Sequence, residues 1–466
     1  MLIILVLLAG FYMAWSIGAN DVANAMGTAV GSGALTLKHA VIIAAILEFS
    51  GAFFFGSHVS ETVQQGIIDP MLFSQTPQLL ACGMLSALIG AGAWMQIATY
   101  FGWPVSTTHS IVGALVGFGL AVGGLEAIYW ENIASIVSSW ILSPVLGGML
   151  SFLIFTFLRQ AIFYSSNPIG AVKKIAPLLV FLVILTLTLV IILDRLSAES
   201  SSYQATSACF ALAAVAAAVT YYCVRSLAPS LEQGHSSSAV SELERSLNKA
   251  KKHLLRIANS SERQLQQEVY LFLDKLGASI KPQADQQGLS KTHSEYAAVE
   301  RVFGKLQIMS ACMMAFAHGA NDVANAIGPL SAAVTLLSGK TIVAMQPVPP
   351  WALALGGAGI VTGLATWGWR VIETIGKKIT LLTPTRGFSA EFGAAAVVAV
   401  ASRIGMPISS THTLVGAVIG VGLARGIGSL DISTMRNILV SWIVTVPAGA
   451  ILSVFSYLLL VKAFSP

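Results

Sequence analysis

Polar motifs that occur twice inside apolar sequence constrain this chain more than any other feature. Residues 18–27 read GANDVANAMG, and residues 319–328 read GANDVANAIG. A second motif, WPVSTTHS at 103–110, returns as MPISSTHT at 406–413, and Ser-Trp followed by Pro occurs at 139–144 and 441–447. The motifs keep their order at offsets of 301 to 303 residues. The chain is therefore expected to hold two copies of one structural unit, with the duplicated polar segments forming two halves of one binding site.

The composition indicates a membrane protein. Of the 466 residues, 55% are apolar and 10% are charged, whereas a soluble domain has about 25% charged residues. Apolar runs long enough to cross ~30 Å of hydrocarbon recur along the chain. The start, MLIILVLLAG, has no basic residue and no cleavage motif, so we expect no removed signal peptide. The net charge of +5 reflects basic loops that set membrane orientation, and no nucleic-acid partner is expected.

The number of apolar segments predicts how the two copies are related. Before the hydrophilic stretch at 226–305, the chain makes an odd number of net crossings if residues 78–123 form a hairpin that enters and leaves on one side. An odd number turns the second copy upside down relative to the first, which produces an inverted-topology repeat. We therefore expect an all-α polytopic membrane protein with two re-entrant helical hairpins and about twelve membrane segments.

Basic residues predict the orientation, because Lys and Arg favour cytoplasmic loops. The predicted outer loops 59–77 and 123–131 contain none. The N- and C-termini are accordingly expected outside and the central loop in the cytoplasm. The predicted divisions are a first repeat at 1–160, two connecting transmembrane helices at 161–225, a cytoplasmic hydrophilic loop with an amphipathic helix at 226–305, and a second repeat at 306–466.

Two aspartates inside apolar sequence predict a cation site. A carboxylate in a membrane helix costs ~2.5–3.5 kcal/mol on insertion scales. Asp21 and Asp322 are each followed one turn later by an asparagine, Asn24 or Asn325. We expect the glycine before each motif to interrupt the helix and free backbone carbonyls, and oxygen donors on a broken helix suit Na⁺. The alternative, that these residues only cap a helix, is weakened by the duplication.

The hairpin tips predict an anion site. Proline ends the incoming half-helix and Ser or Thr then begins the outgoing one. The unpaired N–H groups and the positive dipole of that helix end favour a tetrahedral anion, to which the hydroxyl groups add donors. The histidines that follow, His109 and His412, are expected to be structural, because no orienting acid is repeated with them. Glu48 and Glu391 are isolated carboxylates in apolar runs and are the candidates for coupling groups.

GANDVANA in both halves and P-x-S-[ST]-T-H in both hairpins resemble the inorganic phosphate transporter (PiT) family of secondary symporters. The resemblance covers residues 1–225 and 306–466. It implies an inverted-repeat fold in which phosphate lies between the hairpin tips and the Gly-Ala-Asn-Asp segments. The segments ILEFSGAFFFGSHVSETVQQGIID and GFSAEF look more like the sodium-coupled branch than the proton-coupled one.

The resemblance also implies roles for particular residues and partners. The implied phosphate contacts are Asn20, Asp21, Ser106, Thr107, Thr108, Asn321, Asp322, Ser409, Ser410 and Thr411. The function implied is import of inorganic phosphate with Na⁺ by alternating access, in the cell membrane and not as an enzyme. Na⁺ is the coupling ion, and no other cofactor is expected. The expected partners are phosphate, Na⁺ and the lipid bilayer, and a homodimer is left open.

Other functions fit parts of this pattern. A proton-coupled carrier of phosphate or metal-phosphate, or a sulfate permease, could use the same scaffold. A membrane phosphatase would need a nucleophile, a base and a metal cluster beyond those the sequence contains. A channel would need a continuous polar face on several helices, whereas polarity is confined here to the duplicated motifs.

Overall fold

The computed structural model describes residues 1–195, 202–233, 286–339, 347–373, 382–426 and 430–464, together with Val269 and Gly428. These parts are almost entirely helical, with one isolated β-bridge between Ile68 and Ile128. The helices of the first half are α1 Leu2–Gly31, α2 Leu37–Phe55, α3 Ser57–Gln65, α4 Pro77–Tyr100, α5 Thr107–Gly123 and α6 Trp130–Leu158, followed by α7 Pro168–Arg195 and α8 Ser202–Gln233. The helices of the second half are α11 Gln286–Asp322, α12 Ala324–Leu337, α13 Pro350–Thr366, α14 Trp369–Glu373, α15 Pro384–Arg403, α16 Ser410–Arg425 and α17 Ile432–Phe464. The predicted amphipathic helix of the central loop lies outside the described residues.

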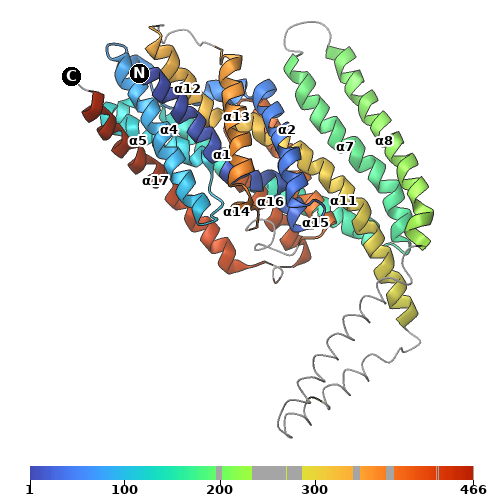
Figure 1. Ribbon diagram of the computed structural model, residues 1–466. Helices are drawn as coiled ribbons and strands as arrows, with labels where there is room; N and C mark the ends of the chain where they lie inside the picture. Colours follow the sequence, from blue (N-terminus) through green and yellow to red (C-terminus); the bar gives the residue numbers. More distant parts are fainter. Residues whose placement is uncertain are drawn as a thin grey trace.

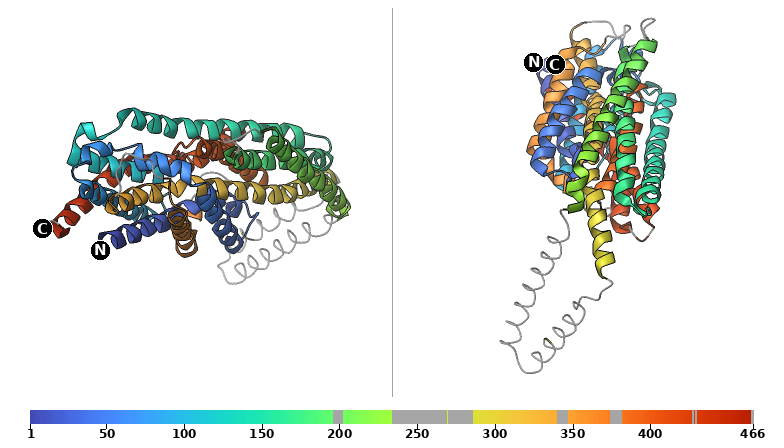
Figure 2. Two further views of the ribbon diagram at one scale, coloured as in Figure 1. Left: turned by 90° about the horizontal axis from the view of Figure 1, so that it is seen from above. Right: turned by 90° about the vertical axis from the view of Figure 1, so that its right-hand side faces the viewer.

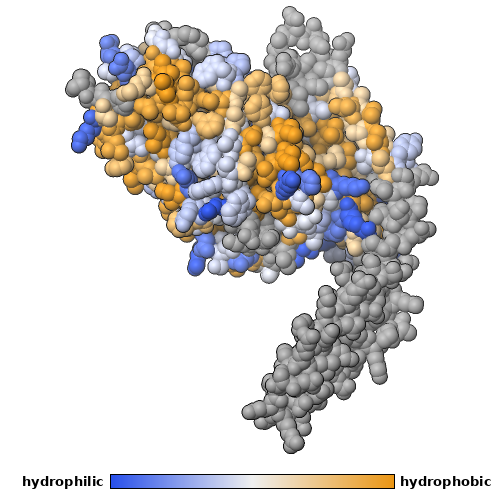
Figure 3. Space-filling model, viewed as in Figure 1, coloured by the Kyte–Doolittle hydropathy of each residue, from blue (hydrophilic) through white to orange (hydrophobic). Residues whose placement is uncertain are grey.

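The surface of the helical bundle is that of a membrane protein. Seven helices among the described residues are long and apolar enough to cross a membrane, and α5 and α13 are shorter apolar helices. Large apolar side chains point outward along α6 and α17, where Ile141 is 68% exposed and Ile443 is 75% exposed. Apolar side chains also cover much of the face in Figure 3. An apolar surface of this extent requires a lipid environment. The all-α polytopic fold is therefore as predicted, and the total of about twelve segments stays a prediction.

The two halves interlock through reciprocal helix pairs. Helix α1 packs on α13 of the other half, and the equivalent helix α11 packs on α2. In the same way α5 packs on α17, and α16 packs on α6. Each contact thus has a counterpart in which the halves exchange roles. The polar motifs on α1 and α11 and on the starts of α5 and α16 meet where the two halves interlock.

The chain ends are arranged as the predicted topology requires. Both termini lie at one end of the bundle, whereas the end of α8 and the start of α11 lie at the other (Figures 1 and 2). The boundaries of the central loop are therefore opposite the termini. Which end faces the cytoplasm remains a prediction from the basic residues.

The expected break in the first Gly-Ala-Asn-Asp segment is wrong. Helix α1 runs without interruption from Leu2 to Gly31, whereas the second copy is interrupted at Val323, between α11 and α12. The glycines serve close helix packing instead. A Cβ atom at Gly18 would overlap the backbone of Ile360, and one at Gly319 would overlap the backbone of Glu48. Absence of a side chain at these positions lets helices from opposite halves touch.

This packing role can be tested by adding a methyl group. The variant Gly18→Ala is expected to destabilise the protein by about 1–3 kcal/mol, because the fixed backbone of Ile360 leaves no room. Gly304→Ala is the matched control, since no atom lies within 4 Å of a Cβ placed there. Thermal unfolding in detergent compares the two. Equal melting temperatures for Gly18→Ala and wild type would contradict the packing role.

Candidate anion and cation site

The hairpin tips are built as the sequence predicts. Helix α4 ends at Tyr100, and α5 begins at Thr107 after Pro104. Ser106 is the N-cap of α5, where its Oγ accepts a hydrogen bond from His109 N at 3.2 Å. In the second copy, Ser409 caps α16 by accepting a hydrogen bond from His412 N at 3.1 Å. Both serines therefore fix the start of a helix whose remaining N–H groups point toward the tip.

The two tips meet, and each threonine bonds to the opposite tip. Thr108 Oγ1 donates to the Ile408 carbonyl at 2.9 Å, and Thr411 Oγ1 donates to the Val105 carbonyl at 3.2 Å. The positive ends of two helices, one from each half, thus converge on one region. This convergence was expected from the duplicated motif.

The duplicated histidines lie directly behind the tips. The rings of His109 and His412 are 4.2 Å apart and meet edge to face. His109 also packs on Trp140 at 3.7 Å, and His412 stacks on Trp442 at 3.6 Å. The Ser-Trp motif therefore supplies the aromatic support for the hairpin motif, and these four rings join the halves.

The asparagines one turn after the aspartates reach across to the opposite hairpin. Asn24 Nδ2 donates to Thr411 Oγ1 at 2.8 Å. Its counterpart Asn325 donates through Nδ2 to Thr107 Oγ1 at 3.2 Å and to Thr108 Oγ1 at 3.3 Å. Each half therefore positions the hydroxyl groups of the other half.

The aspartates contact the same hydroxyl groups. Asp21 Oδ1 lies 3.2 Å from Thr411 Oγ1 and is the alternative acceptor to the Val105 carbonyl for its single proton. Ser410 Oγ donates to Asp322 Oδ2 at 2.7 Å, and Thr107 Oγ1 lies 3.4 Å from the same oxygen. Both carboxylates are at most 1% exposed. Asp21 Oδ2 and Asn24 Oδ1 are buried and have no hydrogen-bond partner among the described residues, so these oxygens can bind a cation.

The asparagines that precede the aspartates hold their own hairpins. Asn20 Nδ2 donates to Thr99 Oγ1 at 2.9 Å and to the Trp103 carbonyl at 3.1 Å. The amide of Asn321 contacts Ser402 Oγ, which is equivalent to Thr99, at 3.2 Å. Both amides are thus engaged with the turn that leads into the tip. In this arrangement both amides position the tips, and their implied contact with phosphate stays a prediction.

The second half departs from the first at His318, a substitution from which the sequence predicts that the two ion sites need not be equivalent. Its Nε2 lies 3.0 Å from Asp322 Oδ2, and its Nδ1 lies 3.3 Å from Glu48 Oε1. All three side chains are fully buried. The first copy has Ile17 at the equivalent position. The signal was present in the sequence, because residues 318 and 322 are four apart and share a helix face.

Three buried side chains that can ligate a metal ion form a compact cluster. One ligand atom each from Asp21, His318 and Asp322 lies within 4.8 Å of the others. The two aspartates, from opposite halves, therefore belong to one polar centre. Carboxylate, amide and hydroxyl oxygens around this centre are the donors that a hard cation prefers.

The other predicted coupling residue, Glu391, occupies a separate polar contact. Its carboxylate accepts hydrogen bonds from Ser310 at 2.9 Å and from Thr28. Glu391 therefore connects α15 with α11 and α1, and it is fully buried. Glu48, by contrast, reaches the aspartate centre through His318.

This fold and site define a polytopic membrane protein of the secondary-transporter class, in which opposed hairpins and buried acids occupy the middle of the protein. Residues 17–453 match the model of the phosphate transporter family. The chain belongs to this family.

The relatives and a solved structure support the same assignment. The chain is 46% identical to the chloroplastic inorganic phosphate transporter 2-1 of Arabidopsis thaliana, over 98% of this chain and 72% of that protein. It is 43% identical to a putative phosphate permease of Chlamydia pneumoniae over 99% of both chains. A solved structure named the sodium-dependent phosphate transporter is 38% identical, with a TM-score of 0.78 and 99% coverage of both chains. These relatives are transporters and permeases, so the chain is not an enzyme and the phosphatase interpretation is dropped.

Proposed function

We propose that this protein is a secondary active symporter that imports inorganic phosphate together with Na⁺. The observation that carries the proposal is the meeting of two helix N-termini with two buried aspartates from opposite halves. Helix N-termini suit an anion, and buried carboxylates suit a cation. A site with both components can bind phosphate and Na⁺ at the same time.

Phosphate is proposed to bind at the tips of α5 and α16. The donors are the N–H groups of the first turns and the hydroxyl groups that follow Ser106 and Ser409. Thr107, Thr108, Ser410 and Thr411 direct these hydroxyl groups toward the aspartates and the opposite tip. Arrival of phosphate would therefore redirect them from the carboxylates to the anion.

Na⁺ is proposed to bind beside the aspartates. In the first copy, Asp21, Asn24 and the Thr411 hydroxyl offer oxygen atoms on connected contacts. The equivalent donors in the second copy are Asp322, Asn325 and Thr108. His318 occupies one side of Asp322, so the two cation sites are not equivalent.

Charge balance provides the coupling in this proposal. Two buried carboxylates repel phosphate unless cations lie between them, and the cations and the anion together reduce the net charge of the loaded site. The loaded protein then reorients at lower cost than a half-loaded one, by alternating access. Glu48, through His318, and Glu391 are the proposed coupling groups, because both are buried between helices that would move.

A second candidate, proton coupling, is favoured by the Glu48–His318–Asp322 contact. Three titratable groups whose successive contacts are 3.3 and 3.0 Å can carry a proton in place of Na⁺. We propose the sodium mechanism first, since the solved structure similar to this chain is named as sodium-dependent. We also propose the cell membrane as the location, with both termini outside and the central loop in the cytoplasm.

Uptake by proteoliposomes tests the proposed function. Labelled phosphate uptake is expected to require Na⁺ and to fall to the level of empty vesicles when choline replaces it. A pH gradient applied without Na⁺ is expected to drive no uptake. Full uptake from a proton gradient in sodium-free vesicles would replace the sodium assignment with the proton candidate and leave the anion site in place. Competition by sulfate at equal concentration checks anion selectivity.

A further inference from the structure

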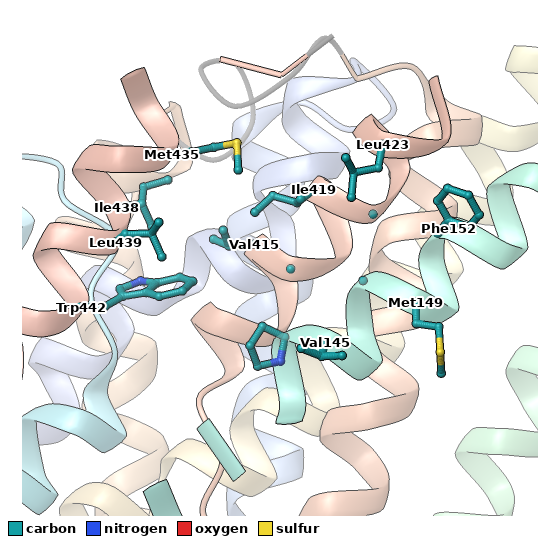
Figure 4. A pocket seen from close by; sticks show the side chains of 14 residues that line it. Val145, Met149, Phe152, Val415, Ile419, Leu423, Met435, Ile438, Leu439 and Trp442 are labelled. Carbon is teal, nitrogen blue, oxygen red and sulfur yellow. The ribbon is translucent and has the colours of Figure 1, made fainter. Parts of the chain in front are cut away.

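An apolar groove runs along the membrane-facing surface between α6, α16 and α17. Its volume is about 420 Å³, and no side chain that lines it carries a charge. Val145, Phe152, Leu423 and Leu439 border it and are between 39% and 59% exposed. Figure 4 shows Leu423, Met435 and Phe152 toward one end and Trp442 and Val145 toward the other. The groove therefore has two distinct ends.

The floor of the groove is backbone and does not close by side-chain rotation. Gly148 of α6 and Gly420 of α16 touch, and a Cβ atom at Gly420 would overlap the carbonyl of Gly148. A Cβ atom at Gly416 would likewise overlap Pro144 O. Three small residues thus set a fixed depression between two helices.

One end of the groove has a rim of arginines. Arg425 follows the lining residue Leu423 in the last turn of α16, and Arg436 directly follows the lining residue Met435. Arg159, one residue after α6 ends, donates through Nη1 to the carbonyl of Ala424. Three basic residues at the ends of these helices are therefore close in the chain to the lining of this end, which the basic-residue pattern places on the cytoplasmic side.

The equivalent end of the other half carries less of this charge, because only Arg159 has a basic counterpart, Lys462. The repeat offset places Val122 and Ala134 at the positions of Arg425 and Arg436. The acidic residues Glu126 and Glu131 occur between them. Arg425 and Arg436 are thus specific to one half and are not imposed by the repeat.

The other end of the groove reaches the hairpin support. Trp442 lines the groove and stacks on His412 at 3.6 Å. His412 directly follows Thr411, which contacts Asp21. A molecule that fills this end of the groove therefore contacts the Trp442 ring, which supports His412 at the tip of α16.

We propose that the groove binds one acyl chain of an anionic phospholipid, whose phosphate lies against Arg425, Arg436 and Arg159. Basic pockets between membrane helices on the cytoplasmic side bind acidic lipid headgroups in this manner. The chain fills the apolar channel, and its end packs against Trp442. Lipid occupancy then stabilises the His412–Trp442 stack, so anionic lipid regulates the transport site.

Lipid retention tests the proposal independently of transport. Purified delipidated protein is exposed to phosphatidylglycerol or phosphatidylcholine, and bound lipid is counted by native mass spectrometry. Wild type is expected to retain phosphatidylglycerol preferentially. Arg425→Gln and Arg436→Gln are expected to reduce retention by about fivefold each. Lys462→Gln, at the opposite end of α17, is the charge control and is expected to have no effect.

A groove-filling variant separates the chain from the headgroup. Leu439→Trp is expected to reduce phosphatidylglycerol retention, whereas Leu459→Trp, about 30 Å further along the same helix, is expected to leave it unchanged. Excess glycerol phosphate is expected not to displace the lipid, because the acyl chain contributes to binding. Equal retention of both lipids, or no effect of the arginine variants, overturns the proposal. If Leu439→Trp abolishes a dimer and leaves lipid binding unchanged, the groove is a subunit interface and the proposal is overturned.

A transport measurement completes the test. Phosphate uptake by wild type is expected to be faster in vesicles that contain phosphatidylglycerol than in phosphatidylcholine alone, and Leu439→Trp is expected to lose this difference. If no vesicle transports phosphate while selective retention persists, the lipid site stands and the proposed function fails. If uptake is identical in both vesicle types, the regulatory part of the proposal is wrong.

Discussion

Replacing Asp21 by asparagine is expected to abolish most sodium-coupled phosphate uptake, and saturating phosphate is not expected to restore it. The substitution keeps the shape and the hydrogen bond from Thr411 but removes the negative charge that offsets Na⁺. Asp21 is buried, so no solvent replaces that charge and the loss is large. Uptake measured across a range of Na⁺ at saturating phosphate checks this result.

The control is Asp431→Asn, which removes a carboxylate from the exposed N-terminus of α17. This variant is expected to transport like wild type. If Asp21→Asn retains full uptake at the same Na⁺ concentration, the aspartate does not serve the coupling ion. If phosphate alone rescues it, Asp21 contributes to anion binding instead.

Thr411→Ala is expected to reduce phosphate uptake about 10- to 100-fold, because each hydrogen bond to a charged group contributes about 1.5–3 kcal/mol. Its hydroxyl group donates to Asp21 or to the Val105 carbonyl and accepts a hydrogen bond from Asn24. Loss of the hydroxyl group therefore disturbs the contact between the halves as well as the anion site. Initial uptake rates in proteoliposomes provide the measurement.

Two further variants test whether the position of the hydroxyl group determines its effect on uptake. Thr411→Ser keeps the hydroxyl group and is expected to retain most activity. Thr413→Ala removes a buried hydroxyl group whose acceptor among the described residues is Ser409 O of the same helix start, and it is expected to change uptake little. Equal losses in Thr411→Ala and Thr413→Ala would show that the defect is one of folding, which would falsify the site assignment for Thr411.

Local chemistry made part of the site predictable from the sequence. The N-caps at Ser106 and Ser409 follow from proline and serine at the start of an apolar run, and they occur as expected. The helix break at Gly18 was predicted by the same kind of reasoning and is wrong. Glycine permits both a break and a close helix contact, and only the neighbouring helix decides between them.

The roles of the asparagines show what local reasoning misses. Asn20 and Asn24 lie four residues apart on α1, and each directly follows an alanine. The amide of Asn20 holds its own hairpin, whereas the amide of Asn24 reaches the hairpin of the other half. Which hairpin an amide meets depends on how the halves interlock, and no pattern within one segment carries that information.

The sequence by itself determined the membrane class, the duplication, the two hairpin tips and the buried acids, because composition and repeated motifs express the cost of placing polar groups in lipid. Only the tertiary structure decided which of these groups meet. It paired Thr411 with Asp21 and Ser410 with Asp322 across the halves, and it placed His318 between Glu48 and Asp322. These contacts join residues far apart in the chain, so they follow from helix packing and not from any local preference.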